Sequence, residues 1–289
     1  MVLYGIEGNE RIMESILANS LFKDIAIRVL DRDKMIDFYR NVLKYRVLWE
    51  ENAVVFFGVK DSKEIGLVLE ESPAHRTRAV KGNPKLRVFQ IQINDKNDFL
   101  ATVKELKDQD IKIEFAWKNQ GAMGVVLLDP ENNRLGIAWS PEGIHVGIRG
   151  AEHVLLEDLL KNEEVTPVDT WTSAYIDFMR LNVPDVKAAS EFYAEAFHVE
   201  FDEHHQADII TTDRPFTLAL SQAQGEDLVG NVDSLWDVEF LEILVPSKAE
   251  IESLKEHFEE EKRDFFVDKA HRILTFKDLS GIEWWFTIK

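Results

Sequence analysis

The chain has 289 residues, enough for about two domains of roughly 100 to 200 residues each. Its 45% hydrophobic and 30% charged residues, without an apolar run near the roughly 20 residues of a membrane helix, predict a globular protein that does not span a membrane. The net charge of -19 makes nucleic acid and anionic membranes unexpected partners, and the absence of cysteine excludes disulfides, thiolate nucleophiles and thiolate metal sites.

The first residues, MVLYGIEGNERIME, lack the basic segment and apolar core of a signal peptide, so we expect a cytoplasmic protein. Residues 1–20 form an N-terminal extension outside the repeat described next. A weak helix over 10–17 and disorder are equally compatible with its pattern.

The strongest feature of the sequence is an internal repeat. The segment 24–48, DIAIRVLDRDKMIDFYRNVLKYRVL, has a counterpart at 178–201, FMRLNVPDVKAASEFYAEAFHVEF. Matched residues keep a constant offset of 154 positions, as in Val29 with Val183, Phe38 with Phe192, Tyr39 with Tyr193, and Leu43 with Phe197. An offset held across an aromatic pair indicates that a structural unit has been duplicated.

Each copy begins as a strand and continues as a helix. Ile25, Ile27 and Val29 alternate as in a half-buried strand, and apolar residues within 35–42 recur at the three- and four-residue spacing of an amphipathic helix. Short strands are expected to follow at 46–50, 53–57 and 65–70 in the first copy, and at 199–203, 207–211 and 216–221 in the second.

A second kind of unit follows each copy and has the order strand, helix and three strands. Its elements are expected at 86–93, 96–109, 111–116, 123–129 and 134–139, and again at 238–245, 249–261, 264–268, 273–278 and 282–287. The sequence therefore predicts an α+β fold of four βαβββ modules, two in each half, with acidic hairpin turns beginning at Asp129 and Asp278. We expect two tandem domains, 21–140 and 173–289, joined by a linker at 141–172 with a short helix around 152–160.

A strand, then a helix ending in FYRNVL or FYAEAF, then a DPENN or DLSG turn resembles the vicinal-oxygen-chelate superfamily of glyoxalases, bleomycin-resistance proteins and dioxygenases. The resemblance covers nearly all of residues 21–289. It implies glyoxalase-like domains in which two modules pair and eight strands curl into a cup. The connector EESPAHRTRAVKG, residues 70–82, further resembles the CppA family of Gram-positive bacteria. Some members of that family carry the label of a proteinase that degrades a complement component, which implies a host protein as a candidate partner.

The resemblance also implies metal ligands, usually His, Glu or Gln, in the first and last strands of the modules. The corresponding positions here are Asp24, Val88 and Gly136 in the first half, and Phe178, Phe240 and Trp284, beside Glu283, in the second. Because a single carboxylate cannot hold a catalytic metal, we expect no metal cofactor, and a glyoxalase- or dioxygenase-type enzyme is disfavoured. The segment Glu203-His204-His205 is the remaining metal candidate, but adjacent residues on a strand point to opposite faces, which favours a solvated strand end.

Strand alternation predicts which side chains face the first cup, namely Asp24, Ala26, Arg28, Val88, Gln90 and Gln92. Burying these polar groups unpaired would cost several kcal/mol for the charge and about 1 to 3 kcal/mol for each amide. A bound anion, carboxylate or amide would satisfy them, with Arg28 as a bidentate donor. Alternatively, Arg28 pairs with Asp24 or another carboxylate, and the glutamines bond each other or water. Both alternatives remain open at this point.

The second cup is predicted to be lined by Phe178, Arg180, Asn182, Phe240, Glu242 and Leu244. This set is more apolar and contains its own candidate ion pair between Arg180 and Glu242, so a structural role is favoured there. In the connector, Arg76 and Arg78 could close over the first cup and hold an acidic ligand. The alternative is an exposed crossing strand with local salt bridges.

Three functional hypotheses follow. The first is a metal-independent protein that binds a small acidic or amide-bearing ligand, or a peptide, in the first cup. The second is the proteinase implied by the family label, for which the chain has no cysteine nucleophile, GxSxG elbow or HExxH zinc motif. The third is an interaction protein whose two domains bury a partner.

Overall fold

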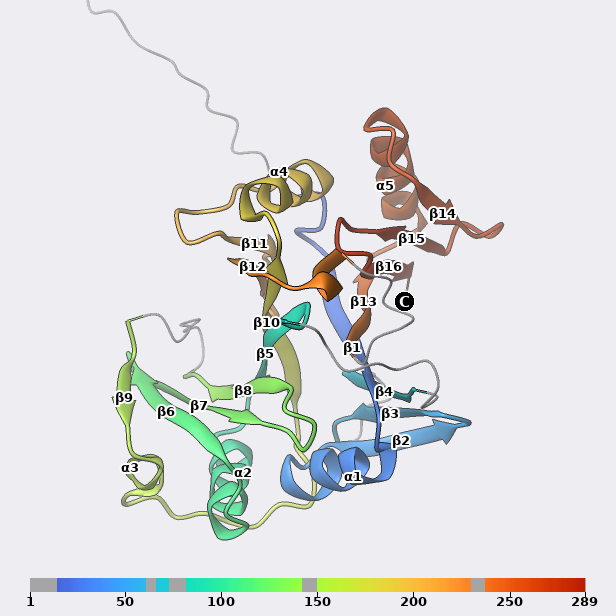
Figure 1. The fold of residues 1–289 in the computed structure, drawn as a ribbon. Coiled ribbons are helices and arrows are strands. Elements are labelled where there is room, and N and C mark those ends of the chain that lie inside the picture. The colour runs from blue at the N-terminus through green and yellow to red at the C-terminus, as the bar shows by residue number, and fades with distance from the viewer. Residues whose placement is uncertain (1–14, 61–65, 73–81, 142–149, 230–236, 289) are drawn as a thin grey trace, which may run out of the picture.

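The computed structural model describes residues 15–60, 66–72, 82–141, 150–229 and 237–288 (Figure 1). Their strands form two mixed eight-stranded sheets, which we call sheet A and sheet B. The predicted α+β class is confirmed. None of the described helices is long and apolar enough to cross a membrane.

Sheet A has the strand order β14-β15-β16-β13-β1-β4-β3-β2. Its strands are β1 (Leu21–Val29), β2 (Arg46–Glu51), β3 (Val54–Gly58), β4 (Leu67–Glu71), β13 (Val238–Val245), β14 (Phe265–Val267), β15 (Ile273–Lys277) and β16 (Glu283–Ile288). Sheet B has the order β11-β12-β10-β5-β8-β7-β6-β9. Its strands are β5 (Leu86–Ile93), β6 (Ile113–Asn119), β7 (Ala122–Leu128), β8 (Arg134–Trp139), β9 (Glu152–Val154), β10 (Ala174–Val183), β11 (Gln206–Ile210) and β12 (Phe216–Gln222).

The helices begin at side chains that cap them. Asp31, Asp95, Asp185 and Ser247 each accept a hydrogen bond from a backbone N–H of the following first turn, which would otherwise lack a partner. The helices so capped are α1 (Arg32–Asp37), which continues into the π-helical turn η1 (Phe38–Val42), α2 (Lys96–Asp108), α4 (Val186–Phe197) and α5 (Lys248–Glu260). The described residues also form two shorter helices, α3 (Leu156–Leu160) and the 3-10 turn η2 (Glu226–Val229).

Each sheet combines one module from each half of the chain. β1 of the first module pairs antiparallel with β13 of the fourth, and β5 of the second pairs antiparallel with β10 of the third. The expectation that the two modules of one half close one cup is therefore wrong. Strand alternation specifies which face of a strand is buried, but it does not specify which other strand pairs with its free edge.

The two modules of one half meet instead on their helical sides. Figure 1 shows α1 near α2 at one end of the molecule and α4 near α5 at the other. The Tyr39 hydroxyl, on η1, donates to Asp129 Oδ2 in the β7–β8 turn at 3.1 Å, and the Tyr193 hydroxyl, on α4, donates to Asp278 Oδ2 in the β15–β16 turn at 2.5 Å. The duplicated tyrosine and the acidic turn thus form the same buried contact between modules in both halves.

Two local expectations are corrected. Residues 199–203 form no strand, because the Asp202 carboxylate accepts the backbone N–H groups of His204 and Gln206 and holds a turn there. Residues 152–160 form β9 followed by the short helix α3 and are not a single helix.

Residues 15–20 lie next to the third module, where the Ser15 hydroxyl donates to the Ile209 carbonyl. The rest of the predicted N-terminal helix lies outside the described residues.

Candidate functional site

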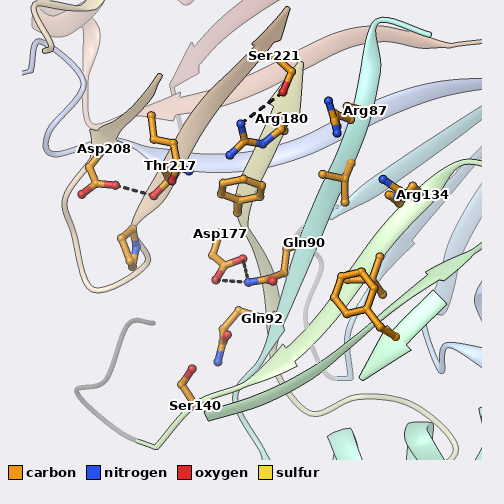
Figure 2. Close-up of a pocket in the computed structure, with 17 residues that line it drawn as sticks. Arg87, Gln90, Gln92, Arg134, Ser140, Asp177, Arg180, Asp208, Thr217 and Ser221 are labelled. Carbon is orange, nitrogen blue, oxygen red and sulfur yellow. Dashed lines mark hydrogen bonds between the residues drawn. The ribbon is translucent and has the colours of Figure 1, made fainter. Parts of the chain in front are cut away.

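A cavity of about 420 Å³ opens on one face of sheet B. Figure 2 shows that β5 contributes Gln90 and Gln92 to it and that β10 contributes Asp177 and Arg180. The ring of Phe178, also on β10, lines the cavity as well. Two residues predicted for the first cup are therefore combined with two predicted for the second.

The other predicted residues lie on sheet A. Asp24 is directly opposite Glu242 across the β1–β13 ladder, and Ala26 is opposite Phe240. The predicted cup sets are therefore corrected: Asp24 and Arg28 belong with Phe240 and Glu242, while Gln90 and Gln92 belong with Phe178 and Arg180. The cause is the pairing of modules across the two halves. Arg76 and Arg78 lie outside the described residues.

Arg180 supplies positive charge to the cavity, and no carboxylate among the described residues lies within ion-pair distance of it, although Asp202 is near enough to act on its charge. Its Nη1 donates to the Leu220 carbonyl at 3.1 Å and lies 3.4 Å from Ser221 Oγ, and its guanidinium lies 5.6 Å from the centroid of the Phe178 ring. Burial lowers the pKa of Arg180, the neighbouring charge of Arg87 lowers it further, and the more weakly acting charge of Asp202 opposes both. Two arginines that repel each other at one end of a cavity favour an anion between them.

Asp177 places a carboxyl group in the same cavity. Gln90 Nε2 donates to both of its oxygens at 3.2 Å (Figure 2). The side chain keeps contact with the cavity but is surrounded by protein, and burial raises the pKa of Asp177 to about 7 while the Gln90 amide opposes the shift. The group is poised to change charge near neutral pH.

Sequence reasoning missed Asp177 because simple alternation points it away from the cup. A β-bulge between Ile176 and Phe178 interrupts the pairing of β10 with β5 and turns Asp177 toward the cavity. The core residues Ile176, Met179 and Leu181 are spaced by three and then two, and an extra residue between core positions is the signal that could have revealed the bulge.

The same bulge occurs in sheet A, 154 positions earlier, between Phe22 and Asp24. The bulged residue there is Lys23, whose ammonium donates to Glu242 Oε2 at 2.5 Å and lies 3.3 Å from Asp24 Oδ2. Burial, followed by the charge of Glu242, raises the pKa of Asp24 to about 8.

Arg28, further along β1, is also paired within sheet A, at 2.6 Å from Glu239 and 3.8 Å from Glu70. This is the second of the two alternatives for Arg28, with Glu239 and Glu70 as partners in place of Asp24. The predicted Arg180–Glu242 ion pair is wrong, because these residues lie in different sheets. Both cations of β1, Lys23 and Arg28, thus have carboxylate partners within sheet A.

Two family models match the chain: CppA N-terminal over residues 22–140 and CppA C-terminal over residues 173–286. The chain belongs to the CppA family. Among solved structures, the CppA protein from Streptococcus pneumoniae TIGR4 is 24% identical, with a TM-score of 0.68 over 94% of this chain and 99% of that one.

Two enzyme structures share the fold at lower identity. A putative dioxygenase from Bacillus subtilis is 13% identical, with a TM-score of 0.63 over 95% of this chain and 86% of that one. Glyoxalase I from Zea mays is 12% identical, with a TM-score of 0.55 over 93% and 92%. These likenesses confirm the glyoxalase-like fold. A search of curated proteins found no match.

The residues of this CppA chain do not fit the metal site that the superfamily implies. In sheet B the ligand positions fall on Val88, Gly136 and Phe178, which carry no ligating atoms in their side chains. Within the described residues no group of three His, Cys, Asp or Glu side chains is arranged to hold a metal ion. Glu203, His204 and His205 lie in an exposed turn, as expected for a solvated segment.

Proposed function

We propose that this CppA-family protein binds a small organic anion in the cavity of sheet B, through arginine and amide groups and without a metal. The observation that carries the proposal is Arg180, a cavity-lining guanidinium whose hydrogen bonds to the described residues go to a carbonyl and a hydroxyl group and not to a carboxylate. The proposed site keeps the predicted ligand chemistry but moves it away from Asp24 and Arg28.

The electrostatics favour a carboxylate at this place. A partly buried guanidinium loses hydration, and a bidentate carboxylate recovers that loss through two charge-assisted hydrogen bonds, each contributing about 1.5 to 3 kcal/mol. Arg87 adds a second positive charge at the same end of the cavity (Figure 2). The Phe178 ring beneath Arg180 supplies apolar surface for the carbon skeleton of the ligand.

The predicted alternative, proteolysis, receives no support from the site. Asp24, the one carboxylate among the residues predicted for the first cup, is fully buried and ion-paired with Lys23. A general acid or base must reach its substrate, and Asp24 does not line the cavity.

The proposal is tested by titrating the wild-type protein, Arg180→Gln and Arg46→Gln with pentanoate and glutarate by calorimetry. Arg46 is an exposed arginine of β2 on sheet A and controls for the loss of one positive charge. We expect saturable binding to wild type and Arg46→Gln, and at least about tenfold weaker binding to Arg180→Gln, equivalent to the loss of one charge-assisted bond. Equal affinity of the two variants, or no binding of either probe to wild type, would overturn the proposal.

A further inference from the structure

The two sheets carry equivalent bulges with opposite charges. Lys23 on β1 and Asp177 on β10 are separated by the 154-residue offset of the duplication, and each is the extra residue of a β-bulge. Glu242 and Gln90 are also equivalent, because they face Asp24 and Phe178 respectively across the corresponding ladders. The bulge therefore presents an ammonium group to carboxylates in sheet A and a carboxylate to an amide in sheet B.

Sheet A supplies its own counter-charge at this position. The Lys23 ammonium lies between the carboxylates of Asp24 and Glu242, and Glu242 also accepts a hydrogen bond from the Thr287 hydroxyl at 2.6 Å. The equivalent place in sheet B has no cation of its own: no Lys, Arg or His among the described residues lies within ion-pair distance of Asp177, whose one side-chain donor is Gln90. A carboxylate has about four acceptor positions. Gln90 donates toward both oxygens of Asp177 and the backbone N–H of Asp177 also donates to the carboxylate, which leaves part of its acceptor capacity for a molecule in the cavity.

We infer that the ligand of sheet B is a zwitterion, an ω-amino acid or short peptide, whose ammonium group binds Asp177 and whose carboxylate binds Arg180. This inference rests on the proposed function and adds the second charge of the ligand. The ligand ammonium would occupy the role that the Lys23 ammonium has in sheet A. Gln90 holds the carboxylate of Asp177 from the β5 side and leaves the cavity side open (Figure 2).

The spacing of the two charged residues sets the size of the ligand. Asp177 and Arg180 are three residues apart on β10, roughly 10 Å along an extended strand. Both side chains line the same cavity, and the Phe178 ring that lines it with them lies 5.6 Å from the Arg180 guanidinium. This spacing fits a ligand with several bonds between its charges better than a single α-carbon.

The inference is tested with three probes of equal chain length: pentanoate, 5-aminopentanoate and glutarate. At pH 8, 5-aminopentanoate should bind about tenfold more tightly than pentanoate, because one added charge-assisted bond is worth about a factor of ten or more. Glutarate should bind less tightly than 5-aminopentanoate, because its second carboxylate would face the ionised Asp177.

The pH dependence of affinity distinguishes a ligand with an ammonium group from a ligand with a second carboxylate. As the pH rises from about 6 to 8, Asp177 ionises, since burial raises its pKa to about 7, and the affinity for 5-aminopentanoate should rise while the affinity for glutarate falls. The other ionisable groups that line the cavity are Arg87 on β5, Arg134 on β8, Arg180 on β10 and Asp208 on β11. Tyr175 on β10 lies close enough to sense the charge of Asp177.

The decisive variant is Asp177→Asn, with Asp208→Asn as the matched control. The Asp208 carboxylate accepts the Thr217 hydroxyl at 2.5 Å and is exposed, so its loss should leave the order of affinities unchanged. Asp177→Asn should abolish the preference for 5-aminopentanoate over pentanoate and remove the opposite pH trends. Retention of Arg180-dependent pentanoate binding without any gain from the amino group would refute the zwitterion and leave the anion site standing. Failure of all three probes, and of 3- to 6-carbon ω-amino acids, to bind wild type would count against the anion site itself.

Discussion

Replacing Asp177 by Asn should change the pH dependence of folding stability in a direction that follows from burial. The pKa of this carboxyl group is raised from 3.8 to about 7 in the folded protein. A raised acid pKa means that the folded state resists ionisation, so stability falls as the pH rises from about 4 to 7 and then stays constant. An Asn at this position does not ionise and avoids that loss.

The magnitude follows from the size of the pKa difference. Between pH 5 and 7 the folded protein loses at most about 1.4 kcal/mol of stability for each pH unit. The two units therefore set an upper limit near 3 kcal/mol on the loss. Because the side chain keeps contact with the cavity, we expect about 1 to 2 kcal/mol. Urea denaturation of wild type and Asp177→Asn at pH 5 and pH 8 measures it as the change in their stability difference. Asp208→Asn serves as a control and should show no such change.

Using the change between two pH values cancels the effect of altering the hydrogen bond with Gln90, which is present at both. A stability difference between Asp177→Asn and wild type that is the same at pH 5 and pH 8 would refute the reasoning. It would mean that the folded protein does not resist ionisation of Asp177, and the ammonium site would then lose its electrostatic basis.

The remaining predictions concern the interface between modules, sheet A and the metal. Tyr39→Phe removes a buried hydrogen bond to Asp129 and should destabilise by about 1 to 2 kcal/mol in denaturation, whereas Tyr45→Phe, whose hydroxyl has no hydrogen bond to the described residues, should have little effect. Lys23→Met should destabilise by about 1 to 3 kcal/mol, because it leaves carboxylates unpaired, yet pentanoate affinity should not change, since Lys23 lies on sheet A. Excess EDTA should leave pentanoate affinity unchanged, and a loss that added divalent metal restores would contradict a site made of Arg180 and amides.

The modules could be predicted from the sequence because each depends on local patterns. The alternation and helical spacing gave β5 at residues 86–93 as the structure has it and α2 and α5 to within one residue. The repeat also identified buried residues with the same structural role, since Tyr39 and Tyr193 make equivalent hydrogen bonds with acidic turns. Local patterns were sufficient wherever the structure depends on residues close in the sequence.

The content of the cups could not be predicted, because it depends on contacts between distant strands. Each first strand has an open edge, and the alternation of β1 is equally compatible with pairing to β5 or to β13. The inward residues Gln90 and Arg180 were identified correctly as lining a concave face, but their assignment to different cups followed from the wrong partner. Asp177 was not predicted as a cavity residue for a second reason. One extra residue in a strand changes which side chains face the cavity, and alternation does not reveal it.

The duplication preserved geometry while the charges at equivalent places diverged. Both copies retain a bulge at the same position and a second one three to four residues later, between Ala26 and Ile27 in β1 and between Arg180 and Leu181 in β10. At the second bulge sheet A has the small, uncharged Ala26, whereas sheet B has Arg180. At the first bulge a lysine that pairs within its sheet corresponds to Asp177, which has no cationic partner among the described residues. Since one copy pairs its cations with carboxylates of its own sheet and the other places unlike charges in a cavity, binding is expected in sheet B and structural support in sheet A.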